Sequence, residues 1–110
     1  MSGPVARRPP PYTRRVIEIL RFALVEGADE VAFLEADKLV QVEFAYQQPG
    51  LLRRTTARAD DGTWVVVDLW QSAEQAEACN ERWGADAVTA AFMSFVAEGS
   101  VTVERYQEIG

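Results

Sequence analysis

A predicted β-hairpin over residues 51–71 constrains the fold more than any other stretch. Residues 63–71 read Thr-Trp-Val-Val-Val-Asp-Leu-Trp-Gln, and such β-branched and aromatic side chains favour a strand. The turn before them, Asp60-Asp61-Gly62, supplies residue types that tolerate the positive φ of a tight hairpin. Apolar side chains fall on both faces of the strand, with Trp64 and Trp70 on the same face. We therefore expect a hairpin whose two faces are both covered.

Two outer strands are predicted in addition to the hairpin strands, which span residues 51–59 and 63–71. Residues 16–25 are rich in β-branched and aromatic side chains and precede Gly27. In residues 100–108, Val101 and Val103 fall on one face and Thr102, Glu104 and Tyr106 on the other. In the first of these strands both parities are largely apolar, so both of its faces should be covered as well.

Two helical regions lie between the strands. Asp29 is the expected N-cap of a helix that runs to about residue 48 and is stopped by Pro49-Gly50. The second region begins with a capping box at Ser72 and is interrupted at Gly84. A shorter helical piece then runs from residue 86 to Gly99.

The order strand, helix, strand, strand, helix, strand predicts a ferredoxin-like βαββαβ arrangement, which is an α+β fold. Right-handed crossovers place both helices on one face of a four-stranded antiparallel sheet. The other face would be bare although apolar side chains project from it. The simplest cover is the same face of a second copy, so we expect a homodimer, a barrel of two sheets burying about 2,000 Å² or more.

The length and the charge of the chain limit which classes of protein it can belong to. The 110 residues predict one domain over residues 14–110, preceded by a flexible Pro/Arg-rich tail over residues 1–13. All 17 acidic residues follow position 15, so the domain is acidic and should repel nucleic acid. The tail, with its four arginines through position 15, could still act as a nucleic-acid arm or lie on the acidic body.

Membrane insertion and secretion are not expected. The apolar runs fall far short of the ~20 residues that span a bilayer, and the N-terminus does not read as a secretory signal. The single cysteine, Cys79, cannot form an internal disulfide, which fits a cytoplasmic protein.

Three stretches carry a resemblance to a known family. They are Gln48-Pro49-Gly50, Asp61-Gly62-Thr63-Trp64, and the run from Asp68 to Ala76 that leads from a strand-end tryptophan into an acidic, alanine-rich helix. With them the chain resembles the dimeric α+β barrel superfamily, and within it the antibiotic-biosynthesis-monooxygenase-like proteins. The resemblance covers residues 16–106. It speaks for the fold more than for the function, because the superfamily holds oxygenases, isomerases, haem enzymes and proteins without known activity.

The resemblance implies oxidation of phenolic or anthrone-like aromatics by O₂ without a metal or flavin cofactor. Such a site lies between the sheet and the helices of each subunit and needs an apolar slot, groups that stabilise an anion, and exclusion of water. Trp70 matches the family's strand tryptophan, although a large buried ring at that position also serves packing.

Five further residues are candidates for the site. Glu43 falls on the predicted buried stripe of the first helix and would be a general base if burial raised its pKa. Its alternative is a helix tip that leaves the core, with Glu43 in solvent. The expected pocket residues are Tyr46, Gln47, Asn80 and Trp83.

The absence of histidine narrows the chemistry further. It argues against Ser-His-Asp and Cys-His hydrolases and against histidine metal sites. Haem-degrading relatives use a strand asparagine and a helix histidine that this chain lacks. Three hypotheses remain: a cofactor-independent monooxygenase acting on an aromatic or polyketide-like substrate, a non-catalytic homodimer that binds a small apolar ligand, and a structural homodimer whose interior is filled by its own side chains.

Overall fold

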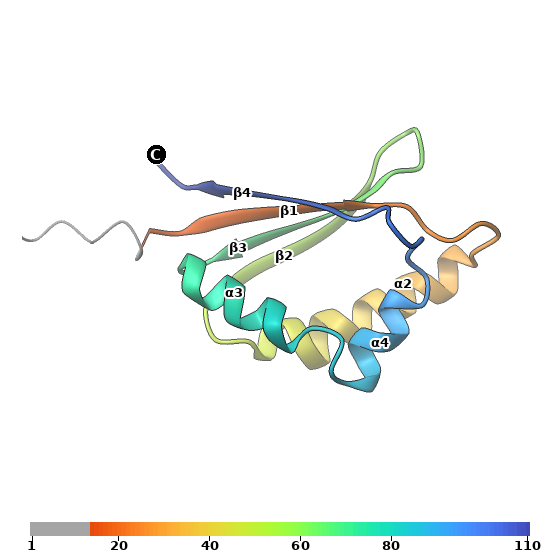
Figure 1. Ribbon diagram of the computed structural model, residues 1–110, viewed down its shortest axis with the longest axis horizontal. Helices are drawn as coiled ribbons and strands as arrows, with labels where there is room; N and C mark the ends of the chain where they lie inside the picture. The colour runs from red at the N-terminus through yellow and green to blue at the C-terminus, as the bar shows by residue number, and fades with distance from the viewer. Residues whose placement is uncertain (1–13) are drawn as a thin grey trace, which may run out of the picture.

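The computed structural model describes residues 14–110, so the predicted tail over residues 1–13 lies outside the described residues. Four antiparallel strands form one sheet in the order β2-β3-β1-β4, and the helices cover one of its faces (Figure 1). The strands are β1 (Val16–Phe22), β2 (Leu51–Arg58), β3 (Trp64–Trp70) and β4 (Thr102–Gln107). This is the ferredoxin-like α+β arrangement that the element order predicts.

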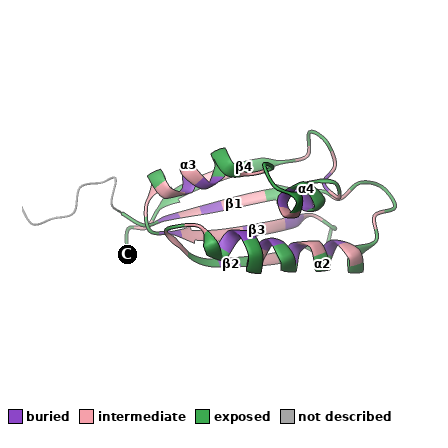
Figure 2. Cartoon of the chain, turned by 90° about the horizontal axis from the view of Figure 1, so that it is seen from below, coloured by how far each residue is buried: buried purple, intermediate pink, exposed green. Residues whose placement is uncertain are grey.

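The helical layer is more broken than the sequence suggests. The predicted helix over residues 29–48 is α-helical only at Glu30–Leu39 (α2), then π-helical at Val40–Phe44 and 3₁₀-helical at Ala45–Gln47. The second region consists of α3 (Ala73–Arg82) and α4 (Ala87–Met93), with the break at the predicted glycine. Figure 2, seen from the helix side, shows buried and exposed residues alternating along α2.

Local side-chain chemistry fixes where these helices begin. Asp29 caps α2, with its carboxylate 3.0 Å from the backbone nitrogen of Val31. The Ser72 hydroxyl accepts a bond of 3.3 Å from the backbone N–H of Gln75 and donates one of 3.1 Å to its side-chain oxygen. The hydroxyl half of the predicted capping box is therefore present, while the Gln75 oxygen accepts from the Ser72 hydroxyl and, among the described residues, not from a first-turn backbone N–H.

Gly50 joins the first helical region to β2 and requires the absence of a side chain. Its φ of +88° lies in the left-handed region, and a Cβ built there would come within 2.1 Å of the Gln75 side chain. Its carbonyl accepts a 2.7 Å hydrogen bond from the backbone N–H of Gln71. The Pro49-Gly50 turn thus packs directly against the start of α3.

Apolar side chains lie on both faces of the sheet. In the pairing of β1 with β3, Phe22 lies opposite Trp64 and Val16 opposite Trp70, and these four side chains are buried on the helix-covered face. The tryptophans therefore do not lie on the uncovered face and do not need a partner chain to bury them. The opposite face carries Ile17, Ile19, Val65, Val67 and Leu69, which are partly buried.

Two groups of buried side chains fill most of the space between sheet and helices. The first surrounds Phe33, whose ring centroid lies 4.9 Å from that of Trp64 and 5.3 Å from that of Phe92. The second surrounds Trp70 and includes Phe44 and Cys79. In the described part of the chain, no helix has the length and apolar character needed to cross a membrane.

Candidate functional site

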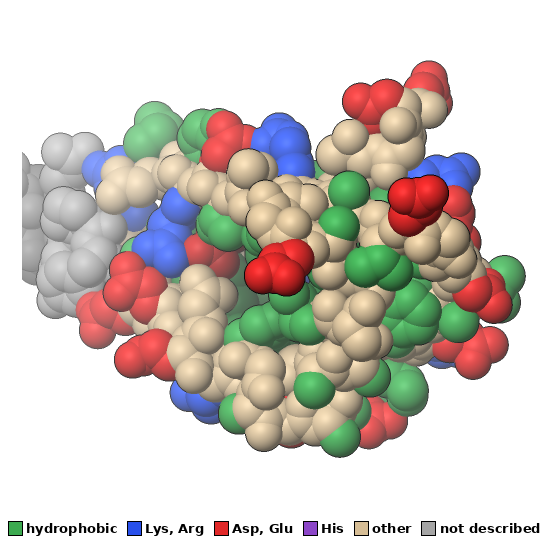
Figure 3. All heavy atoms as spheres, turned by 45° about the vertical axis from the view of Figure 1, so that its right-hand side comes forward, with side chains coloured by type: hydrophobic (Ala, Val, Ile, Leu, Met, Phe, Trp, Pro, Cys, Tyr) green, Lys and Arg blue, Asp and Glu red, His purple; other side chains and the backbone are tan. Residues whose placement is uncertain are grey.

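A cavity of about 370 Å³ lies between the sheet and the helices, next to both core groups. Its wall is largely apolar, and Figure 3 shows hydrophobic side chains gathered in a hollow between the strand and helix layers. The apolar lining consists of Leu20, Phe22, Phe44, Ala45, Leu51, Val66, Trp83, Phe92, Met93, Val96, Val101 and Val103. Met93, Val101 and Val103 are partly open to solvent and form an apolar rim.

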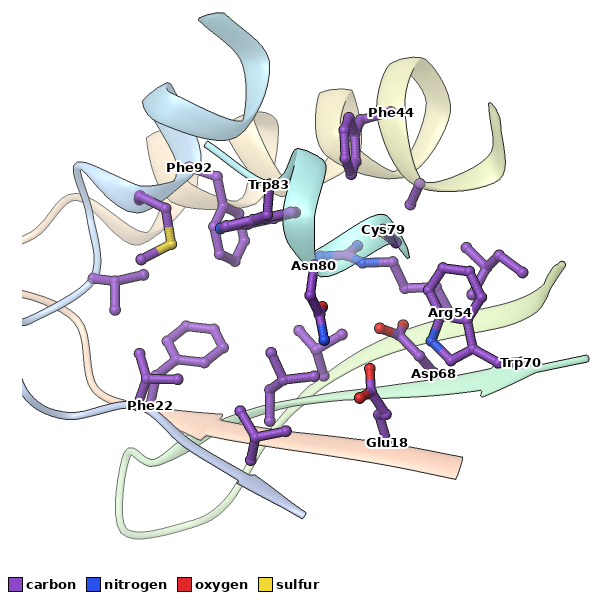
Figure 4. A pocket seen from close by; sticks show the side chains of 18 residues that line it. Glu18, Phe22, Phe44, Arg54, Asp68, Trp70, Cys79, Asn80, Trp83 and Phe92 are labelled. Atoms are coloured by element: carbon purple, nitrogen blue, oxygen red, sulfur yellow. The ribbon is translucent and has the colours of Figure 1, made fainter. Parts of the chain in front are cut away.

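The polar side chains of the cavity wall come mainly from the sheet. Glu18 comes from β1, Arg54 from β2, and Asp68 and Trp70 from β3. Asn80 extends from α3 towards the two carboxylates (Figure 4). An apolar cavity with a few convergent polar groups is the usual form of a small-molecule site.

Glu18 is compensated by an arginine. Only 2% of this residue is exposed, yet its Oε2 accepts hydrogen bonds of 3.0 and 2.7 Å from Nε and Nη2 of Arg105. The two residues lie opposite each other in the pairing of β1 with β4. Another nitrogen of the same guanidinium binds Glu77 on α3 at 3.0 Å. Arg105 therefore ties the edge strand to α3 and neutralises a buried charge.

Arg54 is compensated in the same way on the other side of the cavity. Its Nη2 lies 2.7 Å from Oδ1 of Asp37, which also accepts a 3.0 Å hydrogen bond from the Thr56 hydroxyl. Its guanidinium carbon lies 5.9 Å from the centroid of the Phe92 ring. This buried ion pair holds α2 against β2.

Asp68 differs from the other charged residues of the wall. Its Oδ1 is buried without a hydrogen-bond partner, and no arginine of the described residues forms an ion pair with it. Burial raises the pKa of Asp68 from 3.8 to about 7, the charge of Arg54 opposes this, and the charge of Glu18 adds to it. A carboxyl group that titrates near neutrality therefore lines the cavity.

Trp70 adds a second unpartnered polar atom beside Asp68. The residue is only 2% exposed, and its buried indole Nε1 donates to no acceptor in the described part of the chain. Buried indole N–H groups normally find a partner. Both side chains belong to β3, and both line the cavity (Figure 4).

Cys79 also lines the cavity, but as a thiol. Burial raises its pKa to about 11, and the nearby charge of Asp68 contributes to this rise. It therefore contributes a small apolar surface, as a buried free cysteine usually does.

The structure brings three of the predicted site residues to the cavity. Trp70, Asn80 and Trp83 line it, as expected for the family's strand tryptophan and for the inner side of the second helix. Trp83 also packs edge-on against Phe44 and Phe92, at centroid distances of 5.5 and 5.6 Å.

The other three predicted residues lie outside the cavity wall. Glu43 is exposed, contrary to its predicted place on a buried stripe, and Gln47 is exposed and bonds back to the carbonyl of Val42 at 3.2 Å. Tyr46 is 43% exposed, and its hydroxyl accepts a 2.9 Å hydrogen bond from the backbone N–H of Arg54. The buried side chains of α2 and of the π-helical segment, Phe33, Asp37, Val40 and Phe44, recur at α-helical spacing. At about 100° per residue Glu43 lies about 80° from Phe33 around the helix axis, at the edge of this stripe.

Asp68 and Glu18 are not among the site residues predicted from the sequence, although both line the cavity. A signal for Asp68 was present, since it alternates with Val66 and Trp70 on an apolar strand. Within residues 14–110, no group of three or more histidine, cysteine, aspartate or glutamate side chains is placed to hold a metal ion.

Comparison with known proteins identifies the fold. No protein-family model matches the chain, and no curated protein sequence matches it significantly. Solved structures, in contrast, match the chain over most of its length. The cofactor-independent oxygenase SnoaB from Streptomyces nogalater is 16% identical with a TM-score of 0.71, over 88% of this chain and 95% of that one.

Two further structures agree. A proposed antibiotic biosynthesis monooxygenase from Bordetella bronchiseptica is 13% identical with a TM-score of 0.73, over 87% of this chain and 98% of that one. Another from Caulobacter crescentus CB15 is 15% identical with a TM-score of 0.70, over 90% and 93% of the two chains. At this identity the likeness shows the fold, and it confirms the fold that the resemblance in the sequence predicts.

Proposed function

We infer that this chain, which has the fold of antibiotic-biosynthesis-monooxygenase-like proteins, binds a small aromatic or polyketide-like molecule and oxidises it with O₂ without a cofactor. The observation that carries this proposal is the apolar cavity of about 370 Å³ with an unpartnered carboxyl group and an unpartnered indole N–H in its wall. A ligand that fills the apolar volume and meets these two atoms would remove two buried, unsatisfied polar groups.

The wall suits the requirements of such an oxidation. Phe22, Phe92 and Trp83 offer ring faces and edges to an aromatic substrate. Both substrate and O₂ are apolar and would partition into the cavity from water. For an anthrone-like substrate, a CH₂ group and O₂ give a C=O group and water, so one oxygen atom enters the product and the other leaves in water.

Electrons in this scheme come from the substrate once it has lost a proton. The protein then has to take up that proton and stabilise the anion inside a dry site. Trp70 supplies a hydrogen-bond donor and Asp68 a titratable group. Glu43, the base expected from the sequence, is exposed and is not used in this proposal.

A non-catalytic, ligand-binding homodimer is the second candidate. It needs the cavity but no proton acceptor, and the absence of a sequence match leaves no catalytic residue pattern to favour turnover. The third hypothesis, an interior filled by the chain's own rings, receives less support, because the volume next to Phe44, Trp83 and Phe92 is open.

The homodimer itself remains a proposal that the uncovered sheet face supports. Ile17, Ile19, Val65, Val67 and Leu69 form an apolar surface there that no helix of the described residues covers. A second copy packed on this surface would complete the barrel, and the proposal places this homodimer in the cytoplasm.

A ligand screen and an oxygen electrode test the proposal together. Hydroxylated bicyclic and tricyclic aromatics are added to the full chain, and unfolding temperature and oxygen consumption are measured. A ligand present at 100 times its Kd stabilises the fold by about 2.7 kcal/mol. Thermal stabilisation with oxygen uptake supports the oxygenase, stabilisation without uptake supports the binding protein, and neither result with any compound contradicts both.

A further inference from the structure

Two atoms at one end of the cavity define what a ligand must present there. Oδ1 of Asp68 and Nε1 of Trp70 are both buried, and neither has a hydrogen-bond partner among residues 14–110. Leaving such an atom unpaired in a buried site is unfavourable. This end of the cavity is therefore shaped for a group that the free protein does not supply.

The other charged side chains of the cavity wall already have hydrogen-bond partners within the protein. Oε2 of Glu18 is held by Arg105 through two hydrogen bonds, and Arg54 is held by Asp37 at 2.7 Å. Both ion pairs are internal to the chain. Among the described residues, Asp68 and Trp70 are the side chains at this end with a buried polar atom that has no hydrogen-bond partner, whereas Asn80 is exposed.

Both side chains project from the same face of β3 into the same cavity. Residues two apart on a strand project from the same face and lie about 6.6–7 Å apart along it. Asp68 and Trp70 are such a pair on β3, and both contribute to the cavity wall (Figure 4). An ionised carboxylate accepts hydrogen bonds only, and an indole N–H donates only.

We propose that Asp68 and Trp70 together bind a single hydroxyl group on an aromatic ligand. The hydroxyl donates its hydrogen to Oδ1 of Asp68, and its oxygen accepts the N–H of Trp70. This inference rests on the proposed function, since it concerns the same cavity, and it deepens it by naming the ligand group and the residues that recognise it.

Other ligand groups meet only part of this requirement. An ammonium group would satisfy Asp68 but would leave the indole N–H unpaired, and a carboxylate would be repelled by Asp68 and by the acidic body. An ether or a ketone would satisfy Trp70 but could not donate to the carboxylate. A hydroxyl group meets both atoms.

The same geometry assigns Asp68 as the proton acceptor. The O–H bond of the ligand breaks, an O–H bond forms on Asp68, and the electron pair stays on the ligand oxygen. The resulting negative charge faces the indole N–H of Trp70, and the total charge of the pair does not change. The pKa of Asp68, which is raised to about 7, lies closer to the pKa of a phenol than the pKa of an exposed aspartate does. Proton transfer from a phenol to Asp68 is therefore less unfavourable than transfer to an exposed aspartate.

The test compares 2-naphthol with 2-methoxynaphthalene, which has the same rings but cannot donate a hydrogen bond. Binding to the full chain is measured by calorimetry at pH 8, where Asp68 is ionised. We expect the wild-type protein to bind the naphthol at least tenfold more tightly. In Asp68→Asn the preference falls to less than threefold. In Trp70→Phe, which keeps an aromatic ring without the N–H, both probes bind more weakly, because each carries an oxygen that accepts the indole N–H.

A spectroscopic readout separates proton transfer from mere packing. Bound naphthol should absorb at longer wavelength in the wild-type protein, because the naphtholate ion does so, and should lose this shift in Asp68→Asn. Equal affinity for the two probes in the wild-type protein, or a preference that survives Asp68→Asn, overturns this inference alone. Failure of both probes to bind overturns the proposed function with it. The wild-type comparison decides even if a variant does not fold.

Discussion

Glu18 and Asp68 lie directly opposite each other in the pairing of β1 with β3, and of these two carboxylates only Glu18 forms an ion pair with an arginine of the described residues. Arg105 reaches Glu18 from the edge strand β4, whereas Asp68 faces the cavity. This asymmetry makes one carboxylate structural and leaves the other for chemistry.

Asp68 is expected to make the fold less stable as the pH rises from about 4 to about 7. Its pKa is raised to about 7, so the folded chain holds this proton in that range and the unfolded chain does not. The stabilisation is therefore complete below the unfolded pKa of 3.8 and is lost as the pH rises through 7. Urea unfolding at pH 5 and pH 8 measures the loss, which should be on the order of 2 kcal/mol.

Asp68→Asn is the matched control for this pH dependence, because the amide has nearly the same shape and does not titrate. The variant should lack the Asp68 contribution while keeping that of all other groups. The same change in stability between pH 5 and pH 8 in both proteins would contradict the raised pKa.

Removal of Arg105 should destabilise the fold far more than removal of a similar surface arginine. Arg105→Ala leaves the buried carboxylate of Glu18 uncompensated, at an expected cost of about 3 kcal/mol. Arg21→Ala is the control, since Arg21 pairs with Glu104 across the same two strands but both side chains are exposed, and it should cost below about 1 kcal/mol. Denaturant unfolding compares them, and similar costs would mean that Glu18 does not depend on its arginine.

The proposed homodimer predicts that a charge on the uncovered sheet face separates the subunits. Val67 lies on that face next to Leu69, so Val67→Glu should reduce the mass in light scattering from twice the 12.2 kDa chain mass to the chain mass. Val31→Glu places the same charge on a valine that is already 68% exposed on α2 and should leave the dimer intact. A monomeric wild-type protein, or an unchanged mass in Val67→Glu, would refute the sheet-to-sheet dimer.

Gly50→Ala tests the packing of the turn before β2. Gly50 and Gly27 both have positive φ, but a Cβ would meet the Gln75 side chain only at Gly50 and open space at Gly27. Both substitutions carry the backbone strain, of about 1 kcal/mol or more, and Gly50→Ala should add about 1–3 kcal/mol for overpacking. Thermal unfolding of the two variants provides the comparison, and equal losses would show that Gln75 moves aside freely.

Local signals in the sequence are enough to predict the fold. The turn at Gly62, the caps at Asp29 and Asp86 and the break at Gly84 depend on nearest neighbours along the chain, and all are present in the structure. The strand order follows from the element order and the handedness of crossovers. These features need no knowledge of long-range contacts.

The site depends on contacts that the sequence does not display. Glu43 was placed on a buried stripe that is narrower in the structure, where Phe33, Val40 and Phe44 face the core and Glu43 lies at the edge. Whether Asp68 or Glu18 would gain an arginine depended on which strands are neighbours, since Arg105 is 87 residues from Glu18. Trp70, Asn80 and Trp83 could be placed at the cavity because their faces follow directly from strand and helix periodicity.

Calorimetric titration of 2-naphthol into three proteins tests most directly whether the cavity is the ligand site. Asn80 is exposed at the cavity wall, so Asn80→Phe should fill part of the volume without disturbing the core, whereas Glu81→Phe places the same ring one residue away, outside the lining. The account predicts that wild type and Glu81→Phe bind one naphthol per chain and that Asn80→Phe binds at least tenfold more weakly. Unchanged affinity in Asn80→Phe, or no binding to the wild-type protein, would contradict it.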